Sequence, residues 1–370
     1  MVSIRPMIRY GRVVTCGPPI PATIVSGFLG AGKTTVLNHL LRSPLGIRLG
    51  VLVNDFGDVD IDAELVARSG TAPIALPNGC ICCTIRDDLI GVLSGIGDWP
   101  ERPDHLVVEA SGISDPEALA DLFGLPSYDP PVPLFAVVTV VDAELVREQA
   151  ADWGGRVLLK QLAAADLVVL NKVDLASEEA LSATRAWIEE SVPGARIVEA
   201  VRGEVPPEVL LADTPERRDE RGPRGTGEPS REPGPASPAP SAQAKRSAPH
   251  DPRAAAAHGY ETASFESDRP FSRSALEAAV SGLPTTVVRA KGVLFMDDTP
   301  ERRAVLQVVG RRVTIEPGEP WGDAPPRSRI ALIGPSGRID ADLLLQGFER
   351  ALAGAFRGSP AGRGRSRNNR

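Results

Sequence analysis

The sequence is poor in aromatic residues, histidine and cysteine, and these shortages exclude whole classes of protein. Phe, Trp and Tyr make up 4% of the 370 residues, and the chain has 4 histidines and 4 cysteines. So few cysteines in a chain of this length do not form the framework of a disulfide-rich secreted protein. We find no apolar run with the make-up of a secretion signal, and none long enough to cross a bilayer. We therefore expect a cytoplasmic protein with no membrane partner.

An excess of positive charge is also missing. The formal net charge is −7 at pH 7, which argues against general binding of nucleic acid. Residues 357–370 are the exception, because they are basic and rich in glycine, and we predict a disordered tail there. With 42% apolar residues, the chain is long enough to build two domains with separate cores.

The order of apolar patterns divides the chain into segments. Residues 19–202 alternate short apolar strands with helical patterns, which predicts an α/β domain whose parallel sheet has helices on both faces. Residues 203–258 are rich in Pro, Gly, Ser and charge, and predict a disordered linker. Residues 259–356 combine several strands with a closing helix, which predicts a smaller C-terminal α+β domain. Residues 1–18 are an N-terminal extension.

A glycine-rich stretch, Gly27 to Thr35, carries the clearest chemical signal. It fits the G-x-x-x-x-G-K-[ST] phosphate-loop pattern between a predicted strand and a predicted helix. Its glycines let backbone N–H groups wrap a polyphosphate, and the helix N-terminus adds partial positive charge. In this pattern Lys33 reaches the β- and γ-phosphates, and the Thr34 hydroxyl is a ligand of Mg²⁺. We therefore predict a P-loop NTPase whose nucleotide-binding residues here are Gly27, Gly30, Ala31, Gly32, Lys33, Thr34 and Thr35.

The tetrapeptide Asn171-Lys172-Val173-Asp174 follows a later predicted strand. A carboxylate at Asp174 can accept hydrogen bonds from the N1–H and the exocyclic amine of guanine, a pair of donors that adenine lacks. We therefore predict a preference for GTP, with Asn171, Lys172 and Asp174 as binding residues.

A further strand delivers Glu109-Ala110-Ser111-Gly112, where a P-loop protein places its second carboxylate on the Mg²⁺ side. We predict that Glu109 is a Mg²⁺ ligand and that the Gly112 N–H senses the γ-phosphate, so that this loop changes when GTP is cleaved. Together with Lys33 and Thr34, these two residues make up the predicted catalytic set. No water-positioning glutamine or arginine finger stands out, so we expect slow intrinsic hydrolysis that a partner or a metal accelerates.

Acidic residues follow the predicted strand 48–53, at an edge where α/β sheets bind ligands. We predict that Asp55 contacts a metal ion. For Asp58, Asp60 and Asp62 the choice between a cation contact and a solvated acidic turn stays open.

Three of the four cysteines cluster as Cys80, Cys82 and Cys83. Three thiolates suit Zn²⁺, and three ligands leave an open position, as in a site that passes its metal on. Three alternatives stay open: a redox disulfide between Cys80 and Cys83, inert buried cysteines, and a purely structural metal. Because the cluster is close in sequence to the nucleotide-sensing loops, we hypothesise that nucleotide state changes its metal affinity.

Together these motifs resemble the CobW-type P-loop GTPases, metal-insertion chaperones related to the hydrogenase- and urease-maturation GTPases. The resemblance is carried by the segments GFLGAGKTT (27–35), NDFGDVDID (54–62), GCICC (79–83), EASG (109–112), NKVD (171–174), GYETASFESDRPF (259–271), RAKG (289–292) and PWG (320–322). It implies GTP hydrolysis coupled to handling of Zn²⁺ or Co²⁺ by the three clustered cysteines. Two departures matter. The family usually has Glu where this chain has Asp55 and Asp58, and the family's histidine-rich linker is reduced here to His250 and His258.

We therefore predict a GTP-hydrolysing metallochaperone that uses GTP, Mg²⁺ and Zn²⁺, with Co²⁺ as the alternative metal. It would deliver the metal to an unidentified client metalloprotein through its C-terminal domain. The alternative is a GTP-switched, metal-responsive regulator that binds a translation or stress partner. The resemblance leaves open whether the chain forms a homodimer.

Overall fold

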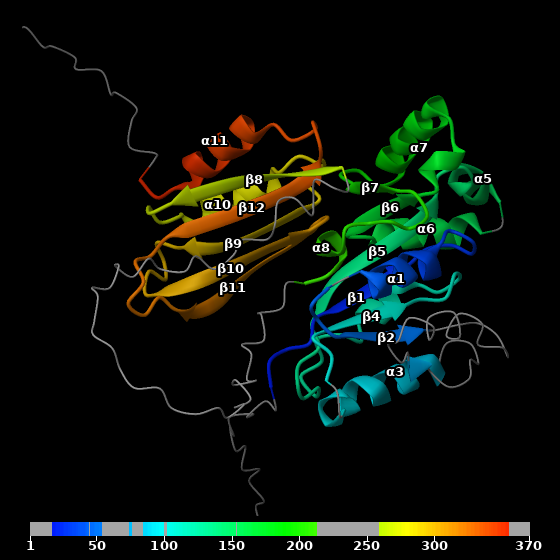
Figure 1. The fold of residues 1–370 in the computed structure, drawn as a ribbon, viewed down its shortest axis with the longest axis horizontal. Helices are drawn as coiled ribbons and strands as arrows, with labels where there is room; N and C mark the ends of the chain where they lie inside the picture. The colour runs from blue at the N-terminus through cyan, green and yellow to red at the C-terminus, as the bar shows by residue number, and fades with distance from the viewer. Residues whose placement is uncertain are drawn as a thin grey trace, which may run out of the picture.

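The computed structural model describes residues 17–43, 45–53, 74–75, 84–99, 102–152, 154–212 and 259–354. Within these ranges the strands form one seven-stranded and one five-stranded sheet (Figure 1). The first sheet has the order β3-β2-β4-β1-β5-β6-β7, and all of its described pairings are parallel. Its strands are β1 (Ala22–Ser26), β2 (Leu49–Val53), β3 (Ile74–Ala75), β4 (His105–Glu109), β5 (Leu134–Asp142), β6 (Leu167–Asn171) and β7 (Ile197–Ala200).

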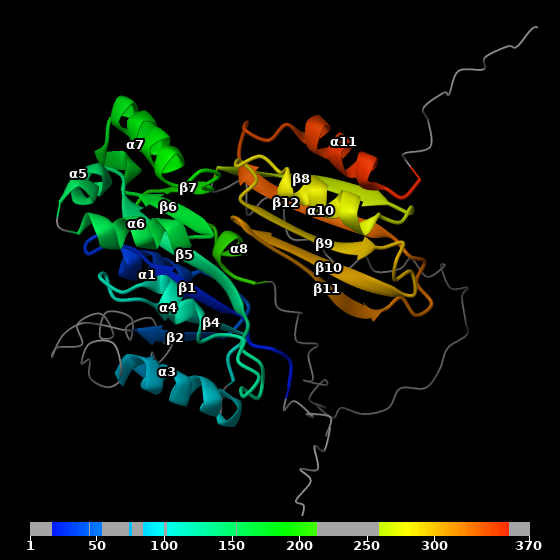
Figure 2. The ribbon, with the colours of Figure 1, turned by 180° about the vertical axis from the view of Figure 1, so that it is seen from behind.

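Helices cover both faces of the parallel sheet (Figure 1, and from behind in Figure 2). The helices of this domain are α1 (Lys33–Arg42), α3 (Thr84–Gly95), α4 (Pro116–Ala120), α5 (Val146–Ala151), α6 (Gly155–Ala164), α7 (Glu178–Ser191) and α8 (Pro207–Leu210). On one face Val36 and Leu37 of α1 pack with Val25 of β1 in one core cluster, whereas Ile24 of β1 packs with Leu119 of α4 in another. Strands that are buried on both faces require continuous apolar runs, and β1, β2, β4 and β6 are buried throughout. The predicted α/β domain is confirmed.

The second sheet is antiparallel, in the order β11-β10-β9-β12-β8. Its strands are β8 (Tyr260–Ser267), β9 (Arg289–Phe295), β10 (Arg302–Val309), β11 (Arg312–Pro320) and β12 (Ser328–Pro335), and its helices are α10 (Arg273–Ser281) and α11 (Ala341–Ala351). The rings of Phe265 on β8 and Phe348 on α11 lie 5.5 Å apart, in a core that also holds Leu276 of α10. The predicted smaller α+β domain is confirmed. In the described ranges, none of the helices combines the length and the apolar character that spanning a bilayer requires.

Residues 203–212 correct our prediction that a disordered linker begins at residue 203. This segment includes α8 and packs on the α/β domain, with Val205, Val209 and Leu210 fully buried. Thr23 Oγ1 donates to the carbonyl oxygen of Leu210 at 2.9 Å, which ties the segment to β1. The reason is that its apolar side chains complete the core on the α1 face, although prolines surround them in the sequence. Residues 213–258 lie outside the described residues.

The C-terminal domain meets the parallel sheet at the edge where strands begin. Arg312 Nε lies 2.8 Å from Asp166 Oδ2, just before β6, and Arg311 donates to the carbonyl oxygens of Ala163 and Ala165 at 2.6 Å. Tyr260, Val288, Val309 and Ile333 also join the core cluster of the first domain. Helix α8 lies between the two sheets in both views (Figures 1 and 2). The opposite edge, where the strands end, is where the predicted nucleotide motifs lie.

Candidate functional site

The predicted nucleotide-binding residues gather at the carboxyl-terminal edge of the parallel sheet. Strand β1 ends at Ser26 before the glycine-rich loop, β4 ends at Glu109, and β6 ends at Asn171. Strands β4, β1, β5 and β6 are consecutive in the sheet, so these three endings lie along one stretch of its edge, with β5 between β1 and β6. Segments that are far apart in the sequence therefore form one site at the place where parallel sheets bind ligands.

The glycine-rich loop has a backbone that only glycine adopts readily. Gly27, Gly30 and Gly32 have φ angles of 139°, 78° and 103°. A Cβ atom on Gly27 would lie 2.1 Å from the carbonyl oxygen of Val140, and one on Gly32 would lie 2.3 Å from Asn171 Nδ2. The positive φ angles and the close packing therefore both exclude a side chain at Gly27 and Gly32.

Helix α1 begins directly after this loop, at Lys33. Its first turn has neither a side-chain cap nor an acidic residue, so its N–H groups and the positive end of its dipole are directed at the loop. Lys33 is 8% exposed, and its Nζ donates to the carbonyl oxygen of Phe28 at 3.3 Å. The loop, the helix end and the ammonium group together suit a polyphosphate.

Two oxygen-bearing side chains from different segments meet beside this loop. Thr34 Oγ1 donates to Glu109 Oε1 at 2.8 Å, although the two residues are 75 positions apart. Glu109 is 4% exposed, so its carboxylate is held within the protein. A hydroxyl and a carboxylate are the hard oxygen donors that Mg²⁺ prefers. The pair therefore fits the predicted Mg²⁺ site, whereas Asp55, its predicted third member, lies outside the described residues.

Asn171 supports the phosphate loop through side-chain hydrogen bonds. Its Nδ2 donates to the carbonyl oxygen of Ala31 at 3.0 Å, and its Oδ1 accepts from the N–H of Gly203 at 2.8 Å. The side chain thus links the phosphate loop to the segment after β7. Its described hydrogen bonds go to backbone groups, so it supports the shape of the site.

Lys172 has a left-handed backbone, with φ 62° and ψ 34°, which is uncommon for a residue other than glycine. Its Nζ lies 2.7 Å from Asp142 Oδ2, and Asp142 is almost fully buried at the end of β5. Asp142 Oδ1 also accepts from the N–H groups of Glu144 and Leu145. The ion pair holds the lysine stem at the site, and Asp174 is exposed in the following turn.

The loop after Glu109 packs directly against the phosphate loop. A Cβ atom on Gly112 would lie 2.5 Å from Leu29 Cδ2 and 3.0 Å from the Leu29 nitrogen. Its carbonyl oxygen accepts from Gln161 Nε2 of α6 at 3.1 Å, and so does that of Ser114 at 3.2 Å. The loop is thus held between the phosphate loop and α6.

The predicted metal residues Cys80, Cys82 and Cys83 lie outside the described residues, as do the acidic positions 58, 60 and 62. The chain enters α3 at Thr84, immediately after the last of these cysteines. Over the part of the chain that is described, no three His, Cys, Asp or Glu side chains gather closely enough to hold a metal.

Sequence reasoning missed Asp142, Gln161 and Gly203 as parts of this site. Asp142 ends a strand as Glu109 does, and this position could have identified it. Gln161 is a polar residue between Leu158 and Leu162 on the buried side of α6, which is also a readable signal. Gly203 gave no comparable signal, because its role depends on the distant Asn171.

His105 is fully buried at the opposite edge of the sheet. Its Nδ1 accepts from the Ala212 N–H at 3.2 Å, and its Nε2 lies 2.9 Å from Thr23 Oγ1. Burial, with a smaller contribution from the charge of Arg289, lowers the pKa of His105 to about 3. The imidazole is therefore neutral at physiological pH and joins the segment 208–212 to the sheet, which is a structural role.

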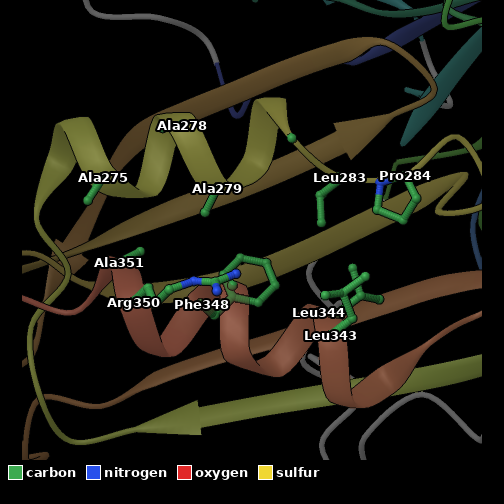
Figure 3. Close-up of a pocket in the computed structure, with 12 residues that line it drawn as sticks. Ala275, Ala278, Ala279, Leu283, Pro284, Leu343, Leu344, Phe348, Arg350 and Ala351 are labelled. Carbon is green, nitrogen blue, oxygen red and sulfur yellow. The ribbon is translucent and has the colours of Figure 1, made fainter. Parts of the chain in front are cut away.

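A groove of about 510 Å³ lies between α10 and α11 of the C-terminal domain. Figure 3 shows Ala275 and Ala279 of α10 facing Phe348 of α11 across it. The charged side chain in its lining is Arg350, and the lining contains no nucleophile or metal ligand. The groove therefore has the character of a contact surface and not that of a reaction site.

Comparison with known proteins agrees with this geometry. Residues 21–199 match the family model described as CobW/HypB/UreG, nucleotide-binding domain, and residues 260–352 match the cobalamin synthesis protein cobW C-terminal domain. The zinc chaperone CobW of Sinorhizobium sp is 36% identical over 219 residues, which cover 52% of this chain and 62% of that protein. The chain thus spans about six tenths of that relative's length.

Two relatives align over more of the chain. Zinc-regulated GTPase metalloprotein activator 1 of Dictyostelium discoideum is 29% identical over 343 residues, covering 80% of this chain and 67% of that protein. Zinc chaperone YjiA of Escherichia coli K12 is 29% identical over 332 residues, covering 85% and 94%. The two family models together match well over half of the chain, one on each domain. The chain therefore belongs to the CobW family of P-loop GTPases.

Proposed function

We propose that this protein hydrolyses GTP and uses the cycle to deliver zinc to a client metalloprotein. The observation that carries the proposal is the meeting of Thr34 and Glu109, 2.8 Å apart, beside the buried Lys33 and the uncapped start of α1. This arrangement suits a nucleoside triphosphate with Mg²⁺ better than any other ligand class, because it combines an anion cradle with a hard-cation site.

The residues of the site have distinct roles in hydrolysis. Backbone N–H groups of the phosphate loop and Lys33 would bind the β- and γ-phosphates, and Thr34 and Glu109 would hold Mg²⁺. Mg²⁺ in such a site neutralises charge that develops on the phosphate oxygens. Gly112, which packs against Leu29, would present its N–H to the γ-phosphate and would move when that group leaves.

Guanine would be read by Asp174, whose exposed carboxylate can accept two hydrogen bonds from the base. Lys172, held by Asp142, would lie along the nucleotide, and Asn171 would keep the phosphate loop in place. Hydrolysis by the protein alone would be slow. Gln161 is the buried glutamine near the loop, and its Nε2 already bonds two loop carbonyls, so it does not orient a water molecule.

Zinc would be bound by Cys80, Cys82 and Cys83, with Co²⁺ as the alternative metal. The relatives named as zinc chaperones support zinc as the metal. We place the protein in the cytoplasm and assign client docking to the C-terminal domain. The division at residues 1–18, 19–202, 203–258, 259–356 and 357–370 stays a proposal, apart from the folded segment 203–212.

The test is a titration of the reduced protein with Zn²⁺ and with Co²⁺, in the presence of a GTP analogue, of GDP, or of no nucleotide. Cys82→Ala is compared with Cys16→Ala, a matched control because Cys16 lies outside the cluster. We expect Cys82→Ala to weaken binding strongly, Cys16→Ala to leave it unchanged, and the nucleotide to shift the affinity by roughly tenfold.

The two candidate functions differ in whether the bound metal passes to an apoprotein: the chaperone should transfer it, and the regulator should keep it. Affinity that is equal in every nucleotide state would contradict the chaperone function and favour the metal-responsive regulator. Weak binding in all variants, including the wild type, would likewise contradict the chaperone function and favour the GTP-switched regulator.

A further inference from the structure

Gln161 is a buried amide that the proposed mechanism leaves without a role. It has no exposed surface and lies on the apolar side of α6. Burying an amide is unfavourable unless hydrogen bonds replace those to water. Its Nε2 donates to the carbonyl oxygens of Gly112 and Ser114, whereas its Oε1 has no hydrogen-bond partner in the described part of the chain. Both donated bonds thus go to the loop that follows Glu109.

Two more polar groups near this loop are buried and unsatisfied. The hydroxyls of Ser26 and Ser111 have no hydrogen-bond partner among the described residues, and both residues are more than nine-tenths buried. Ser26 pairs in register with Thr139, whose Oγ1 donates to the Gln161 carbonyl, so Ser26 faces α6. A partly satisfied polar layer therefore lies at the base of the loop. Such a layer can stabilise a second loop arrangement, because its unused donors and acceptors can form new bonds.

The C-terminal end of α6, close to Gln161, is fastened to the C-terminal domain. Arg311 donates to the carbonyl oxygen of Ala163, near the end of α6, where helical carbonyls lack partners, and to that of Ala165, the residue that caps the helix. The Arg311 N–H donates to the carbonyl oxygen of Asp166 at 2.8 Å, and Arg312 forms an ion pair with the side chain of Asp166. Gln161 and these contacts lie within five residues of each other. A shift of the loop that moves Gln161 therefore acts directly on the domain contact.

We propose that Gln161 is a positioning residue of the GTPase: its amide holds the loop from Glu109 to Ser114 in the hydrolysis-competent arrangement, and α6 passes the loop's change to the C-terminal domain. The inference rests on the proposed GTP hydrolysis. It adds a route by which nucleotide state reaches the domain to which client docking is assigned.

The test compares Gln161→Met with Lys160→Met in the full-length protein. Methionine keeps the length of the side chain but cannot donate a hydrogen bond. Lys160, one position away, also links α6 to this region, through an exposed pair with Asp115. We expect Gln161→Met to lower kcat for GTP roughly tenfold while the Kd for GDP stays within about twofold, because the loop is misplaced and the phosphate cradle is intact. Lys160→Met should keep both values.

Hydrogen exchange of the wild-type protein supplies a measurement that does not depend on a variant's folding. A GTP analogue should change exchange at the amides of residues 310–312 relative to GDP, and Gln161→Met should remove this difference. An unchanged kcat in Gln161→Met, or equal exchange at residues 310–312 in both nucleotide states of the wild type, would overturn the inference alone. A wild-type protein that does not hydrolyse GTP would overturn the proposed function as well.

Discussion

The two edges of the parallel sheet use buried polar residues in opposite ways. At the edge where strands end, Lys33, Glu109 and Asn171 lie beside the glycine-rich loop. At the edge where strands begin, Arg196 and Arg289 donate to backbone carbonyl oxygens of neighbouring segments. The first set surrounds the loop that we propose binds the nucleotide, and the second set joins segments of the chain to one another. The partners of a buried polar group thus indicate its role better than its burial does.

Ionisation at the edge where strands begin is constant near neutrality. Burial lowers the pKa of Arg196 to about 10, so it stays protonated and donates to the carbonyl oxygen of Val287 at any physiological pH. His105 is neutral for the same reason, because burial disfavours its charged form. The edge that joins the domains therefore keeps constant charges near neutrality. Nucleotide, and not pH, is the expected signal.

The largest effect is expected at the carboxyl-terminal edge. Lys33→Met should lower the single-turnover rate of GTP hydrolysis by about 100-fold or more, roughly 3 kcal/mol, because it removes the charge that we propose lies beside the phosphates. Thermal unfolding should change little. A rate close to that of the wild type would show that this edge is not the catalytic one.

At the opposite edge, His105 should act on stability through pH. Its pKa is about 3 in the folded state against 6.5 for the ordinary value, so the unfolded state takes up the proton first as pH falls. The stability that the neutral ring contributes is complete above pH 6.5 and is lost progressively toward pH 3, by about 2 kcal/mol at pH 5.

Urea unfolding at pH 7.5 and at pH 5 tests this linkage. Between these two values, His105→Gln should lose about 2 kcal/mol less than the wild type, although it is less stable at pH 7.5. Equal losses for the two proteins would mean that His105 is accessible to protons in the folded state. Hydrolysis at pH 7.5 should be retained, because this residue lies at the other edge.

A smaller effect is expected at the domain contact. Arg311→Met removes donors to Ala163 and Ala165 and should lower the free energy of unfolding by about 1 kcal/mol, since the side chain is exposed to water. kcat for GTP should stay within about twofold. A large loss of kcat without a loss of stability would show that the domain contact acts directly on hydrolysis at the opposite edge of the sheet.

The smallest effect is expected for the surface pair of Lys160 and Asp115. These side chains are 64% and 38% exposed, and water screens such pairs. Lys160→Met should change stability by less than about 0.5 kcal/mol in urea unfolding. A larger loss would show that this pair contributes to the stability of the α6–α4 contact despite its exposure to water.

Much of the candidate site could be predicted from short motifs. The glycine-rich loop and the strand endings at Glu109 and Asn171 are local patterns. Glycine spacing and the apolar run of a buried strand can both be read from consecutive residues. Position in the sequence could have singled out Asp142 and Gln161, but neither their partners nor that of Arg311 could be assigned in this way. Gln161 meets Gly112 from 49 residues away, and Arg311 meets Ala165 from 146 residues away.

The segment 203–212 shows the same limit for the fold. Its prolines and charged neighbours resemble those of a linker, and composition alone assigned it to one. Its burial depends on the apolar face that α1 and the sheet leave open, and on the hydrogen bonds that Thr23 and His105 offer it.

By itself, then, the sequence determined the two domains, the phosphate loop and the residues that end its strands, because each depends on local periodicity or on the conformational freedom of glycine. Only the tertiary structure decided which groups hold these parts in place: Gln161 against the loop after Glu109, Asp142 beside Lys172, and Arg311 at the end of α6. Such pairings come from strand order and helix packing, which bring together residues whose separation along the chain carries no signal of contact.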